Sequence, residues 1–175
     1  MNIAEVKSYI EKTLPGTKLT IVRDSLLIEN PADLPRVAGL LKESDTYRVD
    51  YLASITGADY LQYLECVYHL FSMERKIGPV ILRARTNREN PSVPSLVPIY
   101  RGAEYQEREI FDLFGIFFDG HPDLRRILMW EGLNASPMRK DYQQEDREKL
   151  SAEDIRWLDE HGVSVPPEFR ESQQG

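Results

Sequence analysis

The sequence contains very little cysteine and lacks the glycine-rich loops that bind nucleotides. Cys66 is the only cysteine among 175 residues, which excludes an internal disulfide and any four-thiolate iron–sulfur or zinc site built from this chain alone. No glycine-rich loop shows the dinucleotide or P-loop spacing between a strand and a helix, which argues against direct binding of NADH or ATP. If the protein takes part in electron transfer, the cofactors are expected on other chains.

Long apolar runs and an excess of positive charge are missing too. The longest apolar runs, such as 80–82 and 110–111, are far shorter than the roughly twenty residues needed to cross a bilayer, so any membrane contact is expected to be indirect. The formal net charge of -7 argues against nucleic acid, because phosphate binding needs clustered lysine and arginine. Residues 1–10 lack the basic and apolar segments of a secretory signal, which predicts a cytoplasm-like compartment.

The composition, 41% hydrophobic and 29% charged, is that of an ordinary globular protein with one core. Asn2 followed by apolar residues at helical spacing predicts a first helix, which ends at the Pro-Gly pair at 15–16. Residues 18–22 and 26–29 are β-prone and predict a hairpin. The Asn-Pro pair at 30–31 predicts the start of a second helix, because a capping side chain precedes proline at the first helical position.

The middle of the chain favours a sheet. Three runs rich in β-branched and aromatic residues, 48–56, 60–72 and 76–86, predict an antiparallel meander, with a turn at the Gly-Ala-Asp triplet at 57–59. Prolines interrupt residues 87–99 and predict an irregular connection. The predicted fold class is therefore α+β, an antiparallel or mixed sheet with two or three helices packed on it.

The remaining chain predicts one more helix and an extended arm. Residues 102–115 suit a helix that stops at Gly115, whereas recurring glycine and proline after it predict irregular backbone. We therefore expect a body domain, 1–115, and a docking arm, 116–175, with a short helix near 151–161.

Residues 105–115 are dense in carboxylates around one arginine, with Glu107, Arg108, Glu109 and Asp112 within two turns. Ion pairs at this spacing on a solvated helix contribute only about 0.2–0.5 kcal/mol each. The same turns carry too many large apolar residues to remain exposed, so much of the helix must be covered. A carboxylate buried there needs an arginine or backbone donors.

The next segment, 118–128, places His121 and Asp123 beside two adjacent guanidinium groups, Arg125 and Arg126. Three interpretations are open at this point. The histidine and aspartate could form an acid–base pair of an enzyme, the arginines could bind an anionic substrate, or the loop could dock on acidic groups of another protein. Docking is favoured because a nucleophile with an evident base and a cofactor fingerprint are both missing.

Arg139, Lys140 and Asp141 repeat this combination of basic residues and a carboxylate later in the arm, which also favours docking. A metal site is not expected. Cys66 and His69 could share a metal, but zinc usually needs four ligands and the other two histidines lie far along the chain.

These segments resemble a known signature. Four segments carry the resemblance: 107–109 (Glu-Arg-Glu), 112–115 (Asp-Leu-Phe-Gly), 120–128 (Gly-His-Pro-Asp-Leu-Arg-Arg-Ile-Leu) and 137–142 (Pro-Met-Arg-Lys-Asp-Tyr). They are similar to the thirty-kilodalton subunit family of NADH-quinone oxidoreductase, the enzyme that in mitochondria is respiratory complex I. Two positions depart from it: Tyr105 stands where the family often has tryptophan, and Ser136 where histidine or tyrosine often precedes the proline.

The resemblance implies a peripheral-arm subunit of a proton-translocating NADH:quinone oxidoreductase, without catalytic activity of its own. It implies that FMN, iron–sulfur clusters, NADH and quinone are bound by other subunits. The expected partners are the large quinone-site subunit and neighbouring iron–sulfur subunits, in a hetero-oligomer. The expected location is the cytoplasmic face of the cell inner membrane, or the matrix side in mitochondria.

The resemblance also gives the candidate site residues their expected roles. A structural ion-pair network is expected from Glu107, Arg108, Glu109 and Asp112. An interface with the partner is expected from His121, Pro122, Asp123, Arg125, Arg126, Arg139, Lys140 and Asp141. Three alternatives differ in class: the equivalent subunit of a membrane-bound energy-converting hydrogenase or of an F420H2- or ferredoxin-linked dehydrogenase, a free-standing enzyme using His121 and Asp123, and an adaptor unrelated to respiration.

Overall fold

The computed structural model describes residues 2–130, 132–133, 135–142 and 152–163. The chain divides into two compact units, Met1–Tyr142 and Gln143–Gly175. The division predicted from the sequence lay after residue 115, whereas residues 116–142 group with the first unit. Polar contacts to the helix before them, described below, explain this difference.

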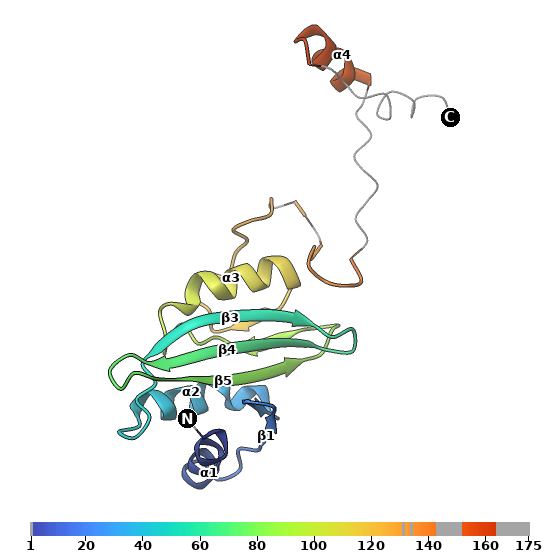
Figure 1. Ribbon diagram of the computed structural model, residues 1–175. Helices are drawn as coiled ribbons and strands as arrows, with labels where there is room; N and C mark the ends of the chain where they lie inside the picture. Colours follow the sequence, from blue (N-terminus) through green and yellow to red (C-terminus); the bar gives the residue numbers. More distant parts are fainter. Residues whose placement is uncertain (1, 131, 134, 143–151, 164–175) are drawn as a thin grey trace. The chain divides into compact units, whose positions relative to one another are not determined.

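The first unit is built on a five-stranded mixed sheet (Figure 1). Its strands are β1 (Leu19–Val22), β2 (Ser25–Ile28), β3 (Tyr51–Asp59), β4 (Leu64–Ser72) and β5 (Ile77–Thr86), in the spatial order β1-β2-β5-β4-β3. The predicted α+β class, the β1–β2 hairpin and the antiparallel β3–β4–β5 meander are confirmed. The parallel pairing of β2 with β5 joins the two groups into one sheet.

The predicted turn at residues 57–59 is wrong, because β3 continues to Asp59. A Cβ atom on Gly57 would lie 2.8 Å from the ring of Phe114, closer than real Cβ contacts. The glycine therefore serves packing: it lets an aromatic ring lie directly on the strand. The chain turns only at residues 60–63.

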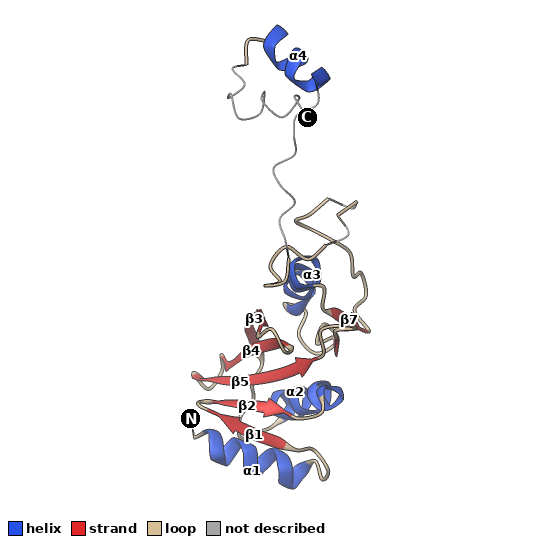
Figure 2. Ribbon diagram, turned by 90° about the vertical axis from the view of Figure 1, so that its right-hand side faces the viewer, coloured by secondary structure: helices blue, strands red, loops and turns tan. Residues whose placement is uncertain are grey.

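Two helices precede β3, as predicted. In α1 (Ile3–Thr13), the side chain of Asn2 accepts a hydrogen bond from the backbone N–H of Ala4 at 3.0 Å. Before α2 (Leu34–Glu43) the chain makes a 3-10 turn, η1 (Pro31–Asp33), capped by Asn30. α2 lies to one side of the sheet and α1 beside β1 (Figure 2). Their apolar faces join the core of the unit.

α3 (Ala103–Phe114) lies along β3, the last strand of the sheet (Figure 1). The side-chain carbonyl of Gln106 accepts a hydrogen bond from the backbone N–H of Ile55 at 2.6 Å. This contact satisfies a donor that an edge strand would otherwise leave open. Covering the edge in this way fixes α3 against the body.

A second, two-stranded sheet was not predicted. β6 (Ser92–Pro94) and β7 (Phe117–Asp119) pair in parallel, inside segments expected to be irregular. Strands of three residues are too short to show an alternating pattern, and Pro94 removes one donor, which restricts it to an edge. The pair brings the chain after α3 back against the body.

In the second unit, α4 (Ala152–Glu160) confirms the short helix predicted near 151–161. The ring of Trp157 stacks on that of His161, with 4.1 Å between the centroids. None of the helices in the described part of the chain is long and apolar enough to cross a membrane.

Candidate functional site

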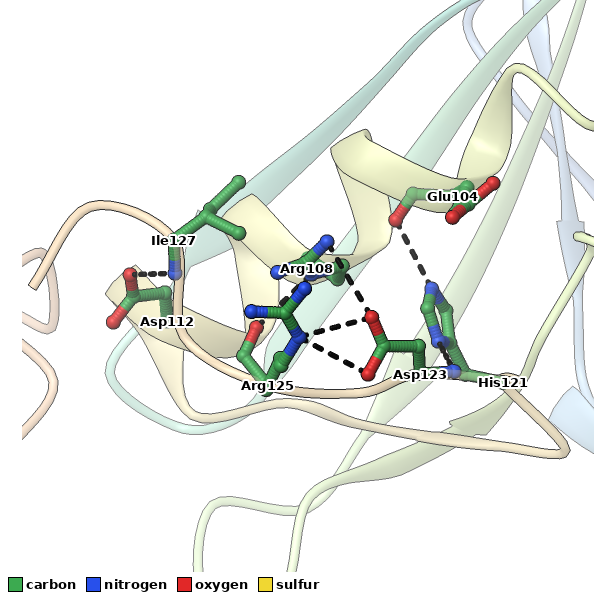
Figure 3. Close-up of polar contacts among 7 residues, drawn as sticks. All are labelled: Glu104, Arg108, Asp112, His121, Asp123, Arg125 and Ile127. Atoms are coloured by element: carbon green, nitrogen blue, oxygen red, sulfur yellow. Dashed lines mark hydrogen bonds and ion pairs between the residues drawn. The ribbon is translucent and has the colours of Figure 1, made fainter. Parts of the chain in front are cut away.

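Asp112 organises the loop that follows α3. Its side chain is fully buried and binds four donors (Figure 3 draws the contact with Ile127). Oδ2 accepts hydrogen bonds from three successive backbone N–H groups, those of Ile127 (3.0 Å), Leu128 (2.7 Å) and Met129 (2.9 Å). Oδ1 accepts from Nη1 of Arg126 at 2.7 Å. One carboxylate thus fixes residues 126–129 on α3.

The same donors keep Asp112 ionised. Burial by itself would raise the pKa of Asp112, but the three amides and the Arg126 guanidinium outweigh it and hold the pKa below its ordinary value. Arg126 also donates to the backbone carbonyls of Asp112 and Ala135, both at 3.1 Å. Asp112 is fully buried and Arg126 partly buried, and both have several hydrogen-bond partners, which an ion pair away from solvent requires.

Arg108 holds the preceding part of the loop (Figure 3). Its side chain is almost fully buried, with Nε donating to the carbonyl of Arg125 at 3.2 Å and Nη1 lying 3.8 Å from Asp123 Oδ2. The guanidinium also lies 5.5 Å from the ring centroid of Tyr105. At the surface, Asp123 accepts from Arg125 Nε at 3.0 Å, and this arginine lowers the pKa of Asp123.

His121 is bound to backbone through both ring nitrogens (Figure 3). Nδ1 accepts a hydrogen bond from the N–H of Asp123 at 3.0 Å, and Nε2 lies 3.0 Å from the carbonyl of Glu104. An amide donor on Nδ1 and a carbonyl acceptor at Nε2 assign the neutral tautomer with its proton on Nε2. Both nitrogens are therefore used in holding the turn, in which Pro122 is exposed.

Two residues of the expected ion-pair network lie apart from its arginine. Glu107 is fully buried on another face of α3, where it accepts hydrogen bonds from Ser95 Oγ (2.6 Å) and the backbone N–H of Leu96 (2.7 Å). Glu109 is exposed. The resemblance grouped the four residues into one network, but on a helix they face three directions. Glu107 thus holds the segment before α3, while Asp112 and Arg108 hold the segment after it.

Glu107 gives a testable pH dependence. Burial raises its pKa, against the lowering by its two hydrogen bonds. When the pKa of a carboxyl is higher in the folded state, the folded protein loses stability as pH rises through the window between the unfolded and folded pKa values. Glu107→Gln keeps an oxygen for Leu96 but cannot ionise. We expect its thermal unfolding temperature, relative to the unmodified protein, to rise from pH 4 to pH 8. A flat or falling difference would contradict this assignment.

A second cluster, the latch, joins the end of the loop to the sheet. Asp59, at the end of β3, accepts hydrogen bonds from the Arg88 side chain and from the backbone N–H of Lys140, the latter at 2.8 Å. Arg88 also pairs with Asp141 at 2.7 Å. Arg139 Nη2 donates to the Arg88 carbonyl at 2.6 Å and Arg139 Nε lies 3.5 Å from Asp141. We define the latch as these five residues.

Sequence reasoning found only part of the latch. Arg139, Lys140 and Asp141 were candidates, but Asp59 was interpreted as a turn residue and Arg88 was not considered. Asp59 and Lys140 are 81 positions apart, so nothing in local spacing connects them. The two residues meet because β3 ends beside this loop in the folded chain.

Gly115 joins α3 to the loop and allows a close contact. Its φ of +71° is left-handed, and a Cβ there would lie 2.6 Å from Ser136 Oγ. We therefore expect Gly115→Ala to lower the free energy of unfolding by about 1–2 kcal/mol from backbone strain alone. Gly102→Ala, where the nearest heavy atom lies 3.8 Å away, is the matched control. Urea denaturation of both variants measures the difference, and equal losses would contradict the explanation.

In the part of the chain that the structure describes, no group of three or more His, Cys, Asp or Glu side chains could hold a metal ion. Most of the candidate residues instead form two clusters that bind parts of the chain after α3 to that helix and to the sheet, whereas Glu107 binds the segment before α3 and Glu109 and Pro122 are exposed.

The fold of this chain also occurs in solved structures. The chain is similar to the trypsin-resistant fragment (1-134) of Nqo5, at 27% identity and a TM-score of 0.51, over 71% of this chain and 100% of that one. It shares its fold with a chain of the membrane-bound sulfane sulfur reductase, an archaeal respiratory membrane complex. There the TM-score is 0.64 at 22% identity, over 93% and 92% of the two chains.

Residues 27–148 match the family model described as respiratory-chain NADH dehydrogenase, 30 Kd subunit, and the chain belongs to this family. It is 43% identical over 114 residues to a subunit of the NADH-quinone oxidoreductase of Roseiflexus sp. (strain RS-1), covering 63% of this chain and 65% of that one. It is 36% identical over 148 residues to a subunit of the same type of enzyme from Salinispora tropica, covering 79% and 60%. The chain thus spans less than two thirds of the length of these relatives.

Proposed function

We propose that this chain is a non-catalytic subunit of the peripheral arm of a proton-translocating NADH:quinone oxidoreductase, in which it holds together the quinone-site and electron-transfer subunits. Membership in the 30 Kd subunit family supports the type of complex. The scaffolding role rests on one observation: the charged side chains of the signature bind other parts of this chain. Asp112 is occupied by three loop amides and Arg126, so it shapes a surface and has no free oxygen directed at a substrate.

The remaining signature residues support the same role. Both nitrogens of His121 are bound to backbone, which leaves neither for the acid–base pair considered from the sequence. Arg108 binds a carbonyl of the loop, and Arg139 binds a carbonyl beside the sheet. Groups that are committed to backbone in this way build and position a segment. Such a segment is what a docking protein presents to its partners.

The same proposal assigns the cofactors and the location. FMN, iron–sulfur clusters, NADH and quinone are held by other subunits, among them the large quinone-site subunit and neighbouring iron–sulfur subunits. The chain lies on the cytoplasmic face of the cell inner membrane, or on the matrix side in mitochondria, and touches the membrane only through its partners. The names of its relatives, which are subunits of NADH-quinone oxidoreductases, support only the type of complex on which this assignment rests.

The test is purification of the tagged chain from detergent-solubilised membranes of its native host, with identification of the co-purifying proteins and an NADH-to-quinone assay. We expect flavin and iron–sulfur subunits together with inhibitor-sensitive activity. Subunits of a hydrogenase or of an F420H2- or ferredoxin-linked dehydrogenase would replace the proposal by the equivalent subunit of that complex. A chain that purifies without redox partners, or that turns over substrate alone and loses activity in His121→Ala, would overturn it.

A further inference from the structure

Large apolar side chains are exposed around the loop that Asp112 fixes. Tyr105 is 66% exposed, Leu128 56%, Trp130 67% and Met138 55%, while Ile127 is 37% exposed. Soluble domains rarely expose so much contiguous apolar surface unless another molecule covers it. We call these five residues the anchor surface.

Backbone contacts bring the segments that carry these residues to α3. The amides of Ile127 and Leu128 bind the carboxylate of Asp112, and the amide of Met138 binds the carbonyl of Leu113 at 3.0 Å. Asp112 and Leu113 are neighbours in α3, so both exposed segments lie at one end of this helix. Tyr105 extends the surface along the helix, because Arg108 contacts its ring and also binds the loop carbonyl at Arg125.

The backbone of residues 127–129, which carries part of the anchor surface, is held by hydrogen bonds. Three successive amides on one buried carboxylate, with Arg126 tied to α3 and to the Ala135 carbonyl, fix the loop backbone before any partner arrives. Figure 3 shows Ile127 beside Asp112, and the side chains of Ile127 and Leu128 remain exposed on this held backbone. A preordered surface loses less conformational entropy on binding, which is how hydrophobic anchors gain affinity.

Charges at the edge of the surface indicate the partner. The Arg125 side chain is 69% exposed, and Lys140 is exposed beside Met138. Arg125 is paired with Asp123 and Asp141 is paired with Arg88, whereas Lys140 has no ion pair among the residues that the structure describes. The rim thus offers the cation of Lys140 to a partner, although the whole chain carries a net charge of -7.

We propose that the anchor surface, and not the buried signature charges, makes the contact with another subunit of the complex, inserting into an apolar recess edged by carboxylates. This rests on the proposed function and identifies the chemistry of its docking site. Asp112, Arg108 and Arg126 then act on assembly only by holding this surface in shape. The exposed cation of Lys140 sets orientation at its rim.

The test compares tagged full-length variants purified from native membranes. Leu128→Ser combined with Trp130→Ser removes two anchors and keeps the Asp112 contacts, because Leu128 binds Asp112 through its backbone amide. Met73→Ser, in the turn between β4 and β5 and 63% exposed, is the matched control. We expect the double variant to recover at least about tenfold less of the other redox subunits per tagged chain, with an unchanged unfolding temperature, and the control to recover as much as the unmodified chain.

Lys140→Glu tests the rim, since the latch uses only the backbone amide of Lys140. We expect lower recovery that falls further as salt is reduced, because repulsion between like charges is then less screened. Unchanged recovery in the double variant would overturn the anchor surface while leaving the proposed function intact. Failure of the unmodified chain to bring down redox subunits would instead contradict the proposed function itself.

Discussion

Asp112→Asn is expected to destabilise the protein by about 2–4 kcal/mol, because it leaves the partly buried Arg126, whose side chain is 21% exposed, without its countercharge. The NH2 group of the asparagine would also face donors, either the Arg126 guanidinium or the backbone N–H groups of 127–129. The donors on that side would then lose their acceptor. Domains of this size are stable by about 5–15 kcal/mol, so the variant should still fold. Chemical denaturation of the full chain measures the loss.

Hydrogen exchange locates the damage. In the unmodified protein, the amides of Ile127, Leu128 and Met129 are protected by one carboxylate, so we expect these three to exchange faster in the variant while the amides of β4 stay protected. Glu109→Gln, on the exposed side of the same helix, is the control and should change stability by less than about 0.5 kcal/mol. A similar loss in both variants would contradict the role assigned to Asp112.

Asp59→Asn is expected to cause the second large loss of stability. Burial alone would raise the pKa of Asp59, but Arg88 and the amides of Lys140 and Leu61 lower it from 3.8 to about 2. The folded-state pKa lies below the unfolded value, so the carboxylate contributes stability above pH 4, and this contribution is lost as pH falls toward 2. Its size is about 2 kcal/mol at neutral pH.

The pH dependence separates the latch from a general effect of substitution. The difference in unfolding free energy between Asp59→Asn and the unmodified protein should have its full size at pH 6 and shrink between pH 4 and pH 2. Hydrogen exchange of residues 139–142 should increase in the variant, since Lys140 loses its acceptor. Asp45→Asn, an exposed carboxylate, is the control. A pH-independent difference would show that the Asp59 charge is not what binds the loop.

Local signals were predictable from the sequence. Asn2 and Asn30 cap their helices through side chains that bind backbone only two residues away. Their effect can therefore be recognised from a few adjacent residues. Gly115 ends α3 for a similarly local reason, a left-handed backbone. The density of apolar residues among the carboxylates of α3 correctly predicted a covered helix with buried charges.

Contacts that depend on tertiary structure were not predictable in the same way. The parallel pairing of β2 with β5 joins residues that are 56 positions apart, such as Leu26 and Leu82. Spacing identified Asp112 as a member of an ion-pair network, but three of its four donors are backbone amides, which carry no sequence signature. The expected interface charges were assigned to a partner, and the structure instead shows many of them bound within the chain.

The most direct test of the scaffolding role is the inhibitor-sensitive NADH-to-quinone activity of native-host membranes from which this chain has been deleted. We predict that the activity and the assembled complex are both lost, that the unmodified chain restores them, and that the purified chain alone shows neither turnover nor visible absorbance. Membranes that keep full activity without the chain would contradict the account.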